Sequence, residues 1–209
     1  MEPMPAMTRE DEIWAACLDL ALEGYNAGSM GIASIITDEG GRIVGCGRNH
    51  LDDAADSTGA ICLSVVAHAE INALHGIGKA GMERRDLTLY TTVEPCPMCL
   101  GAIGMSRIRK VLIGSRDPYA GSVGDLGKNA YLKSKDIQTT FRRDGIETIC
   151  FGLHYLSARR ALSDRPGHRF FAAVHGHYGD IVDRIEGGIR TRRIATDRLD
   201  RSVFSEFFP

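Results

Sequence analysis

Two short motifs constrain this chain more than any other feature of its sequence. They are His68-Ala69-Glu70 and, further along, Pro95-Cys96-Pro97-Met98-Cys99. Together they supply three side chains that bind transition metals: His68, Cys96 and Cys99. A structural zinc site is normally closed by four protein ligands, whereas a catalytic one keeps three and leaves the fourth position for water. The two motifs therefore predict a catalytic zinc (Zn2+) site.

Glu70 is an acid that this metal site does not need as a ligand. It lies two positions after His68, and on a helix that spacing turns it about 200° away, so one ion is not readily bound by both. We therefore predict that Glu70 lies beside the water on the metal and moves protons as a general acid/base. An activated water and a proton shuttle together fit the hydrolysis of an amino group on an electron-poor ring, with release of ammonia.

The residues around these motifs resemble the zinc-dependent deaminases, whose signature combines H-x-E with P-C-x-x-C. Within the cytidine/deoxycytidylate deaminase superfamily, residues 91–103 are similar to the version found in tRNA adenosine deaminases and guanine deaminases. Residues 45–49 are similar to that family's second strand, and residues 116–121 to the loop after its fourth strand. The resemblance extends over roughly residues 8 to 151.

The resemblance implies the same three metal ligands and the same proton shuttle, and it adds three substrate contacts. Asn49 closes the second strand and is expected to contact substrate, and the backbone amide of Ala69 is expected to meet the ring. Asp117 is a looser match to an acid that binds the departing amine in guanine and cytosine deaminase relatives. Because Asn and Asp also commonly form turns, a structural role for either residue stays open.

Two segments depart from the family pattern. Residues 30–34 read Met-Gly-Ile-Ala-Ser, where the family usually carries Pro-x-Gly-Ala. Residues 65–67 read Val-Val-Ala, where the tRNA enzymes have Pro-Thr-Ala immediately before their His-Ala-Glu. Both segments are expected at the walls of the pocket, so they leave the substrate open and the zinc chemistry intact.

The fold implied by the resemblance is α/β, a three-layer α/β/α sandwich around a mixed sheet of about five strands with extra C-terminal helices. Local patterns predict strands over residues 30–37, 42–48, 87–92 and 110–115. For the fifth strand, residues 147–151 are favoured over residues 137–141. Helices are predicted from a cap at Thr8, over residues 61–75, from Pro95 onward, and over residues 155–185 with a break at 165–167.

This organisation divides the chain into a zinc-dependent deaminase domain, residues 8–153, and a C-terminal helical extension, residues 154–209. The extension carries an arginine pair, Arg159-Arg160, and a cluster at residues 190–193. Such runs are usually solvated faces, although an enzyme that acts on RNA would use them to hold phosphates.

Charge and cysteine content indicate the partners and the compartment. The net charge is −2 and the pI is near 6.4, which favours a small-molecule substrate over nucleic acid without excluding the latter. The four cysteines outside the metal motif are predicted to be buried free thiols in a reducing compartment. They are Cys17, Cys46, Cys62 and Cys150.

With no secretory pattern at the N-terminus and no membrane span, a cytoplasmic location is expected. Relatives commonly form dimers, so a homo-oligomer is expected by analogy.

The predicted function is zinc-dependent hydrolytic deamination of an amino-substituted nucleobase or nucleoside. The alternative is a tRNA-specific adenosine deaminase that acts on a flipped-out base. Three other interpretations stay open: a Cys-x-x-Cys redox pair, a structural zinc site closed by His75 or another thiol, and a zinc-bound scaffold without turnover. The first two of these leave Glu70 without a role.

Overall fold

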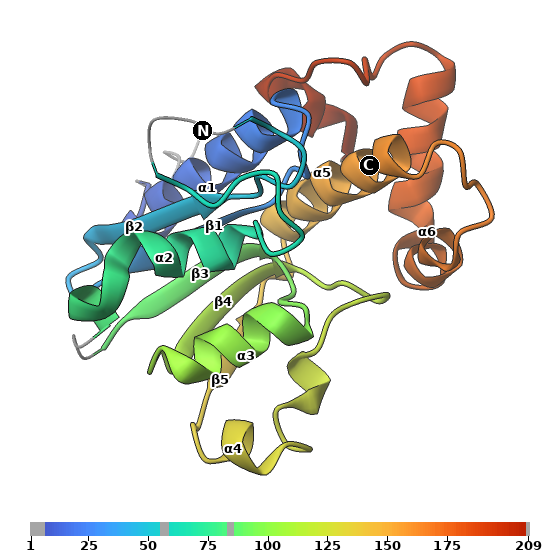
Figure 1. Ribbon diagram of the computed structural model, residues 1–209. Coiled ribbons are helices and arrows are strands. Elements are labelled where there is room, and N and C mark those ends of the chain that lie inside the picture. Colours follow the sequence, from blue (N-terminus) through green and yellow to red (C-terminus); the bar gives the residue numbers. More distant parts are fainter. Residues whose placement is uncertain (1–6, 55–58, 83–85, 208–209) are drawn as a thin grey trace, which may run out of the picture.

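The core of the molecule is one five-stranded sheet with the strand order β2-β1-β3-β4-β5 (Figure 1). The computed structural model describes residues 7–54, 59–82 and 86–207 of the 209-residue chain. Its strands are β1 (Ala33–Thr37), β2 (Ile43–Arg48), β3 (Thr88–Val93), β4 (Lys110–Ser115) and β5 (Gln138–Phe141). Strand β1 is antiparallel to both of its neighbours, whereas β3, β4 and β5 are parallel. The predicted mixed sheet is confirmed.

Helices cover both faces of this sheet and give three layers (Figure 1). Helices α2 (Ala69–Met82) and α3 (Pro97–Met105) lie on one face, and α1 (Arg9–Asn26) and α5 (Gly145–Ala161) on the other. Successive strand residues point to opposite faces. Leu89 packs in the cluster under α2 and α3, and its neighbour Tyr90 packs in the cluster under α1 and α5.

Helices α1 and α3 begin where the sequence predicts a helix start. Thr8 is the N-cap of α1 and forms a capping box with Asp11. Cys96 is the N-cap of α3, and Pro97 occupies the first turn, where proline fits because its missing N–H has no partner to lose.

Two of the predicted elements are wrong. Residues 147–151 are not the fifth strand but part of α5, which Asp144 caps by accepting a hydrogen bond from the amide of Ile146. The fifth strand is Gln138–Phe141, the segment that was not favoured. Its short polar sequence at the sheet edge gives a weak strand pattern, whereas residues 149–153 form an apolar run that a buried strand and a buried helix have in common.

The predicted helix over residues 61–75 is also misplaced, because α2 begins at Ala69. Residues 61–68 form an irregular loop in which Leu63 has a positive φ of 48°. The amide of Leu63 donates to the carbonyl oxygen of His50, and the amide of Ala67 donates to Ser64. The first contact is made with the loop after β2 and the second lies within residues 61–68. No helical period in the sequence indicates either of them.

The C-terminal part of the chain packs on the α1 and α5 face. It comprises α6 (Arg169–Arg190) and the 3-10 helix η2 (Arg201–Phe207), whose buried residues Val174, Ile185 and Phe207 join the same core as Trp14 and Phe151. The predicted helical character is confirmed, but α5 starts ten residues before the predicted residue 155. Helix α5 also runs across the predicted boundary between residues 153 and 154, and the division into two parts stays a prediction.

Smaller elements complete the fold between β4 and β5. They are the 3-10 helix η1 (Val123–Asp125) and the short helix α4 (Ala130–Lys133). Among the described residues, no helix combines the length and the apolar character that crossing a membrane requires.

The cysteines outside the metal motif are free, as predicted, but they are not all buried. Cys17 and Cys150 are buried, Cys62 is partly exposed, and Cys46 is exposed. Cys46 lies on the edge strand β2, where Gly45 and Gly47 face α2. Its side chain therefore points to the opposite, less covered side.

Candidate metal centre

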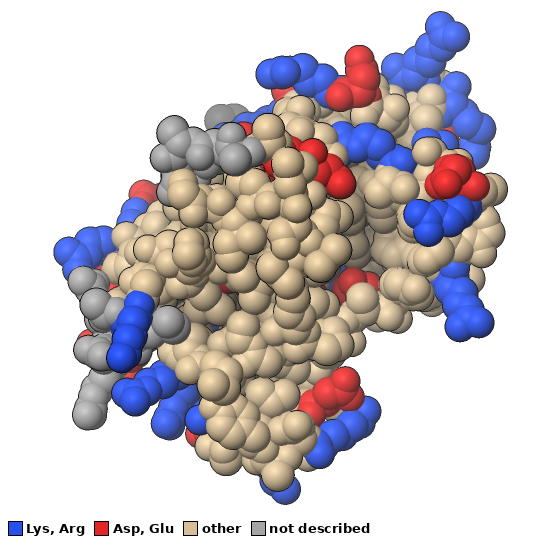
Figure 2. Space-filling view, viewed as in Figure 1, with Lys and Arg blue, Asp and Glu red and all other residues tan. Residues whose placement is uncertain are grey.

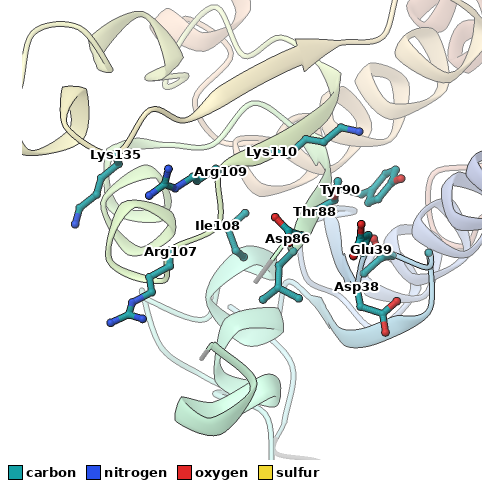
Figure 3. A pocket seen from close by; sticks show the side chains of 13 residues that line it. Asp38, Glu39, Asp86, Thr88, Tyr90, Arg107, Ile108, Arg109, Lys110 and Lys135 are labelled. Carbon is teal, nitrogen blue, oxygen red and sulfur yellow. The ribbon is translucent and has the colours of Figure 1, made fainter. Parts of the chain in front are cut away.

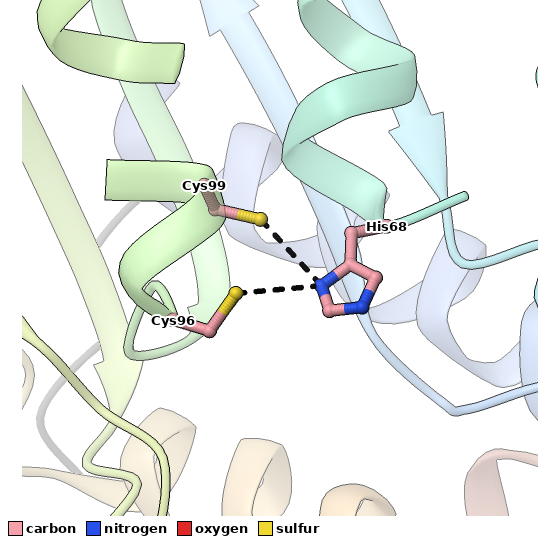
Figure 4. A group of neighbouring side chains, drawn as sticks. All are labelled: His68, Cys96 and Cys99. Atoms are coloured by element: carbon pink, nitrogen blue, oxygen red, sulfur yellow. Dashed lines mark hydrogen bonds between the residues drawn. The ribbon is translucent and has the colours of Figure 1, made fainter. Parts of the chain in front are cut away.

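The three predicted ligands meet where two helices begin on the same face of the sheet. His68 immediately precedes α2, Cys96 caps α3, and Cys99 lies in the first turn of α3. The ligand atoms of the three residues lie within 4.8 Å of one another. Figure 4 shows both sulfur atoms facing the Nδ1 edge of the imidazole, with the other ring nitrogen pointing away.

The distances between these atoms fit a tetrahedral zinc ion. Nδ1 of His68 is 3.7 Å from Sγ of Cys96 and 3.5 Å from Sγ of Cys99. With Zn–N near 2.05 Å and Zn–S near 2.3 Å, tetrahedral angles place a nitrogen and a sulfur ligand about 3.6 Å apart. The residues therefore fit zinc in both donor type and spacing, and the structure supports the predicted cofactor.

The two thiols lie close enough together for each to change the pKa of the other. A hydrogen bond from the Cys99 thiol, aided by one from His68, lowers the pKa of Cys96 to about 4. The same contact, together with burial, raises the pKa of Cys99. The contact with Cys96 also raises the pKa of His68. Because zinc binds deprotonated ligands, binding at this cluster releases the protons that these contacts hold.

Glu70 is a buried acid in the first turn of α2, beside this cluster. Its side chain is 4% exposed, and its Oε1 accepts a hydrogen bond of 3.1 Å from the hydroxyl of Thr91 on β3. Burial raises the pKa of Glu70, while a hydrogen bond from the Cys99 thiol opposes the rise. Among the described residues, the group able to hold an ion contains His68 and the two cysteines but not Glu70.

Asn49 and Ala69 are both buried near the metal ligands. Asn49 directly follows β2, and its amide donates to the carbonyl oxygen of Ile32 across 2.9 Å. Its side-chain Oδ1 accepts from the amide of Leu51 across 3.0 Å, which is a turn-forming contact. Ala69 is the first residue of α2. A substrate contact stays a prediction for both residues.

Asp117 lies in the loop after β4 and forms a turn there. Its Oδ1 accepts hydrogen bonds from the amides of Tyr119 and Ala120, at 2.9 and 3.0 Å. The role of Asp117 toward a departing amine stays a prediction. His75, the fourth ligand of the closed-site interpretation, is exposed on α2 and does not belong to the cluster of described ligand residues.

Glu94 is a residue of the site that the sequence analysis missed. Its two carboxylate oxygens accept hydrogen bonds from the amides of Val123 (3.1 Å) and Asp117 (3.3 Å). A Cβ added at Gly121 would lie 2.4 Å from the carboxyl carbon of Glu94. Glu94 therefore ties the segment that leads into Cys96 to the loop after β4. The only signal in the sequence was its place immediately before Pro95.

The C-terminal helices also reach the loop after β4, which the sequence analysis did not predict. The hydroxyl of Tyr178 on α6 accepts a hydrogen bond of 2.8 Å from the amide of Arg116 and donates one of 2.9 Å to Glu147. The ring of Tyr119 packs edge-on against His168 and Phe170 at the start of α6. The loop that carries Asp117 is thus held from the C-terminal side as well.

A cavity of about 960 Å³ lies at the opposite end of the sheet. It is lined by Thr37 at the end of β1 and by Thr88 and Lys110 at the starts of β3 and β4. Figure 3 shows Arg107, Arg109 and Lys135 on one side of it and the acidic side chains on the other, with Lys110 toward the acidic side. Because Cys96 follows the other end of β3, this cavity is not part of the metal centre.

Several known proteins are similar to this chain. A tRNA-specific adenosine deaminase of Haemophilus influenzae is 34% identical over 55% of this chain and 63% of its own length. A guanine deaminase of Bacillus subtilis is 36% identical over 50% of this chain and 64% of its own length. The chain thus spans less than two thirds of the length of these curated relatives.

A solved structure supports the fold. The guanine deaminase of Nitrosomonas europaea matches 74% of this chain and 88% of its own chain, with a TM-score of 0.50 and 21% identity. At that identity the likeness concerns the fold alone, and it agrees with the five-stranded sheet and its helices. Residues 7–115, which include all three metal ligands and Glu70, match the model of the cytidine and deoxycytidylate deaminase zinc-binding region. This chain belongs to that family.

Proposed function

We propose that this protein catalyses the zinc-dependent hydrolytic deamination of an amino-substituted nucleobase or nucleoside, with release of ammonia. The observation that carries the proposal is the buried carboxylate of Glu70, held by Thr91 next to three ligand side chains with tetrahedral spacing. Three protein ligands leave the fourth position open for water, which is the arrangement of a catalytic site.

Each residue of the centre has a defined task in this reaction. His68, Cys96 and Cys99 hold the ion, and a bound zinc makes water nucleophilic at neutral pH by lowering its pKa. Glu70 would carry one proton from the attacking water to the ring nitrogen. It would then carry a second proton, from the hydroxyl that the attack adds to the ring carbon, to the amine, which leaves as ammonia. Thr91 fixes one oxygen of the Glu70 carboxylate, so the other oxygen is oriented for the transfer.

A free base or nucleoside is the favoured substrate. The net charge of −2 gives no overall attraction to phosphates, and several arginines of the C-terminal helices are engaged within the molecule. Arg159 pairs with Glu186, and Arg193 pairs with Glu206. On the face shown in Figure 2, basic side chains around the C-terminal helices alternate with acidic ones instead of forming one patch.

A tRNA-specific adenosine deaminase is the second candidate. The similarity to the Haemophilus influenzae enzyme of that name favours it. The exposed arginines Arg190 and Arg192, separated by one residue of the C-terminal segment, favour it as well. Such an enzyme would use the same metal centre but would flip the base out of a structured nucleic acid.

Ammonia release tests both candidates. We expect release from at least one member of a panel of free bases and nucleosides, and its loss in the Glu70→Gln variant. The matched control, Glu39→Gln, changes an exposed glutamate far from the centre and should retain full activity. Release from tRNA alone would support the second candidate. Zinc-loaded protein that releases ammonia from neither class of substrate would contradict the proposal and favour a scaffold without turnover.

The organisation of the protein is part of the same proposal. We propose a deaminase unit over residues 8–153 with a C-terminal extension over residues 154–209, a homodimer or larger homo-oligomer, and a cytoplasmic location. The free cysteines outside the metal cluster support a reducing compartment. Analytical ultracentrifugation of the zinc-loaded protein tests the assembly, and a monomer at micromolar concentration would contradict it.

A further inference from the structure

Asp53 is a buried carboxylate that binds the residues on both sides of Asn49. Its Oδ2 lies 2.6 Å from Nη1 of Arg48 and 3.1 Å from Nδ1 of His50. The side chains of Asp53 and Arg48 are each 10% exposed, and that of His50 is 5% exposed. A charged group is rarely buried to this extent without a partner, because its desolvation is costly. The carboxylate therefore fixes the backbone on either side of the predicted substrate contact.

The second oxygen of Asp53 connects this cluster to the segment before β1. Oδ1 of Asp53 accepts a hydrogen bond of 2.7 Å from the hydroxyl of Ser29, which in turn accepts one of 2.9 Å from the amide of Asp52. The carbonyl oxygen of Ser29 accepts a hydrogen bond of 2.6 Å from Arg160 on α5. The network thus extends from the loop after β2 to a helix that follows the last strand.

The same network ends next to the metal ligands. The amide of His50 donates across 2.9 Å to the carbonyl oxygen of Ala67, the residue immediately before His68. The carbonyl oxygen of His50 accepts from the amide of Leu63 across 3.0 Å. His50 therefore joins the loop that carries Asn49 to the loop that leads into the first ligand. A shift of Asp53 would be transmitted to Asn49 through both Arg48 and His50.

We infer that Asp53 is a positioning residue that sets the place of Asn49 relative to the metal centre without touching substrate itself. The inference rests on the proposed function for what Asn49 binds. It gives the loop after β2 a role in substrate affinity. It also implies that Ser29 and Arg160 stabilise that loop through their hydrogen bonds. Among the described residues, no hydrogen bond or ion pair joins Asp53 to the metal ligands or to Glu70.

The test compares Asp53→Asn with Asp52→Asn, the same substitution at the exposed neighbour, in the full-length zinc-loaded protein. We measure the zinc content per chain, amide hydrogen exchange, and kcat and KM for the best substrate of the panel. For Asp53→Asn we expect unchanged zinc, faster exchange at the amides of His50 and Leu63, and a KM raised about tenfold with kcat changed much less. Asp52→Asn should match the parent protein in every readout.

Several outcomes would overturn the inference. These are unchanged exchange at His50 and Leu63, an unchanged KM, or a fall in kcat that follows a loss of zinc. If the parent protein releases no ammonia from any substrate, the proposed function fails, and the exchange at the two amides still decides whether Asp53 holds the loop. If Asp53→Asn does not fold, Ser29→Ala keeps the Asp53 carboxylate and removes the hydrogen bond to Oδ1 together with the one from the amide of Asp52. It is expected to produce the same changes to a smaller degree.

Discussion

The hydroxyl of Thr91 donates a hydrogen bond of 3.1 Å to Oε1 of Glu70, and this contact links β3 to the first turn of α2. Both side chains are buried, so the carboxylate has a fixed orientation and limited access to solvent. The contact joins the centre of the sheet to the helix that begins immediately after His68. The sheet, and not the helix alone, therefore determines where the proton shuttle lies.

Thr91→Val should lower kcat about tenfold while zinc content stays the same. Valine keeps the shape of threonine but removes a hydroxyl that lies 3.1 Å from both Oε1 of Glu70 and the carbonyl oxygen of Val93, so the buried carboxylate loses this donor. Steady-state kinetics with metal analysis checks this, and Thr88→Val at the start of the same strand is the matched control. Equal losses in the two variants would show that the effect comes from the strand and not from the contact with Glu70.

Cys99→Ser should remove most of the bound zinc and lower the melting temperature. Serine is a much poorer ligand for zinc than a thiolate, and the ion contributes stability only to the folded chain that binds it. Metal analysis and calorimetry with and without a chelator measure the two effects. Cys46→Ser, at an exposed thiol on β2, should change neither. Full zinc occupancy in Cys99→Ser would mean that another side chain closes the site.

Glu94→Ala should destabilise the protein by about 1–3 kcal/mol, because the amides of Val123 and Asp117 lose their acceptors. Since these amides hold the segment before Cys96, zinc affinity should fall as well. Urea unfolding and competition with a chelator measure the two quantities, with Glu39→Ala as the exposed control. A loss of stability without any change in zinc affinity would contradict the link to the ligand.

His154 should make the protein less stable as the pH falls. Its side chain is 5% exposed, its Nδ1 has no hydrogen-bond partner among the described residues, and burial lowers its pKa. The unfolded chain therefore binds the proton more readily, so stability is full above about pH 6.5 and declines below it. Urea unfolding at pH 7.5 and 5.5 should show a smaller decline for His154→Gln than for the parent. An equal decline would assign the acid sensitivity to other groups.

The metal centre and most of the sheet were predictable because their signals are local. Strand β4 lies where the apolar run of residues 110–115 places it, and Cys96 caps α3 where the prolines predict a helix start. The ligand set could be predicted because His and Cys are residue types that bind zinc. Their spacing along the chain can be read from the sequence without knowledge of the fold.

The missed features depend on contacts between distant parts of the chain. Residues 61–68 stay irregular because they bind the loop after β2, and Glu94 acts through amides more than twenty residues away. The contact of Tyr178 with Arg116 joins a C-terminal helix to the end of β4. No period or motif in the sequence carries such information, because each contact arises only when separate elements pack together.

Phe207 fills a space on α5 that exists only because residue 152 is glycine. A Cβ at Gly152 would lie 2.5 Å from the ring, which is fully buried among residues of α1, α5 and α6. A chain cut before residue 207 would therefore leave this part of the apolar layer on α1 and α5 uncovered.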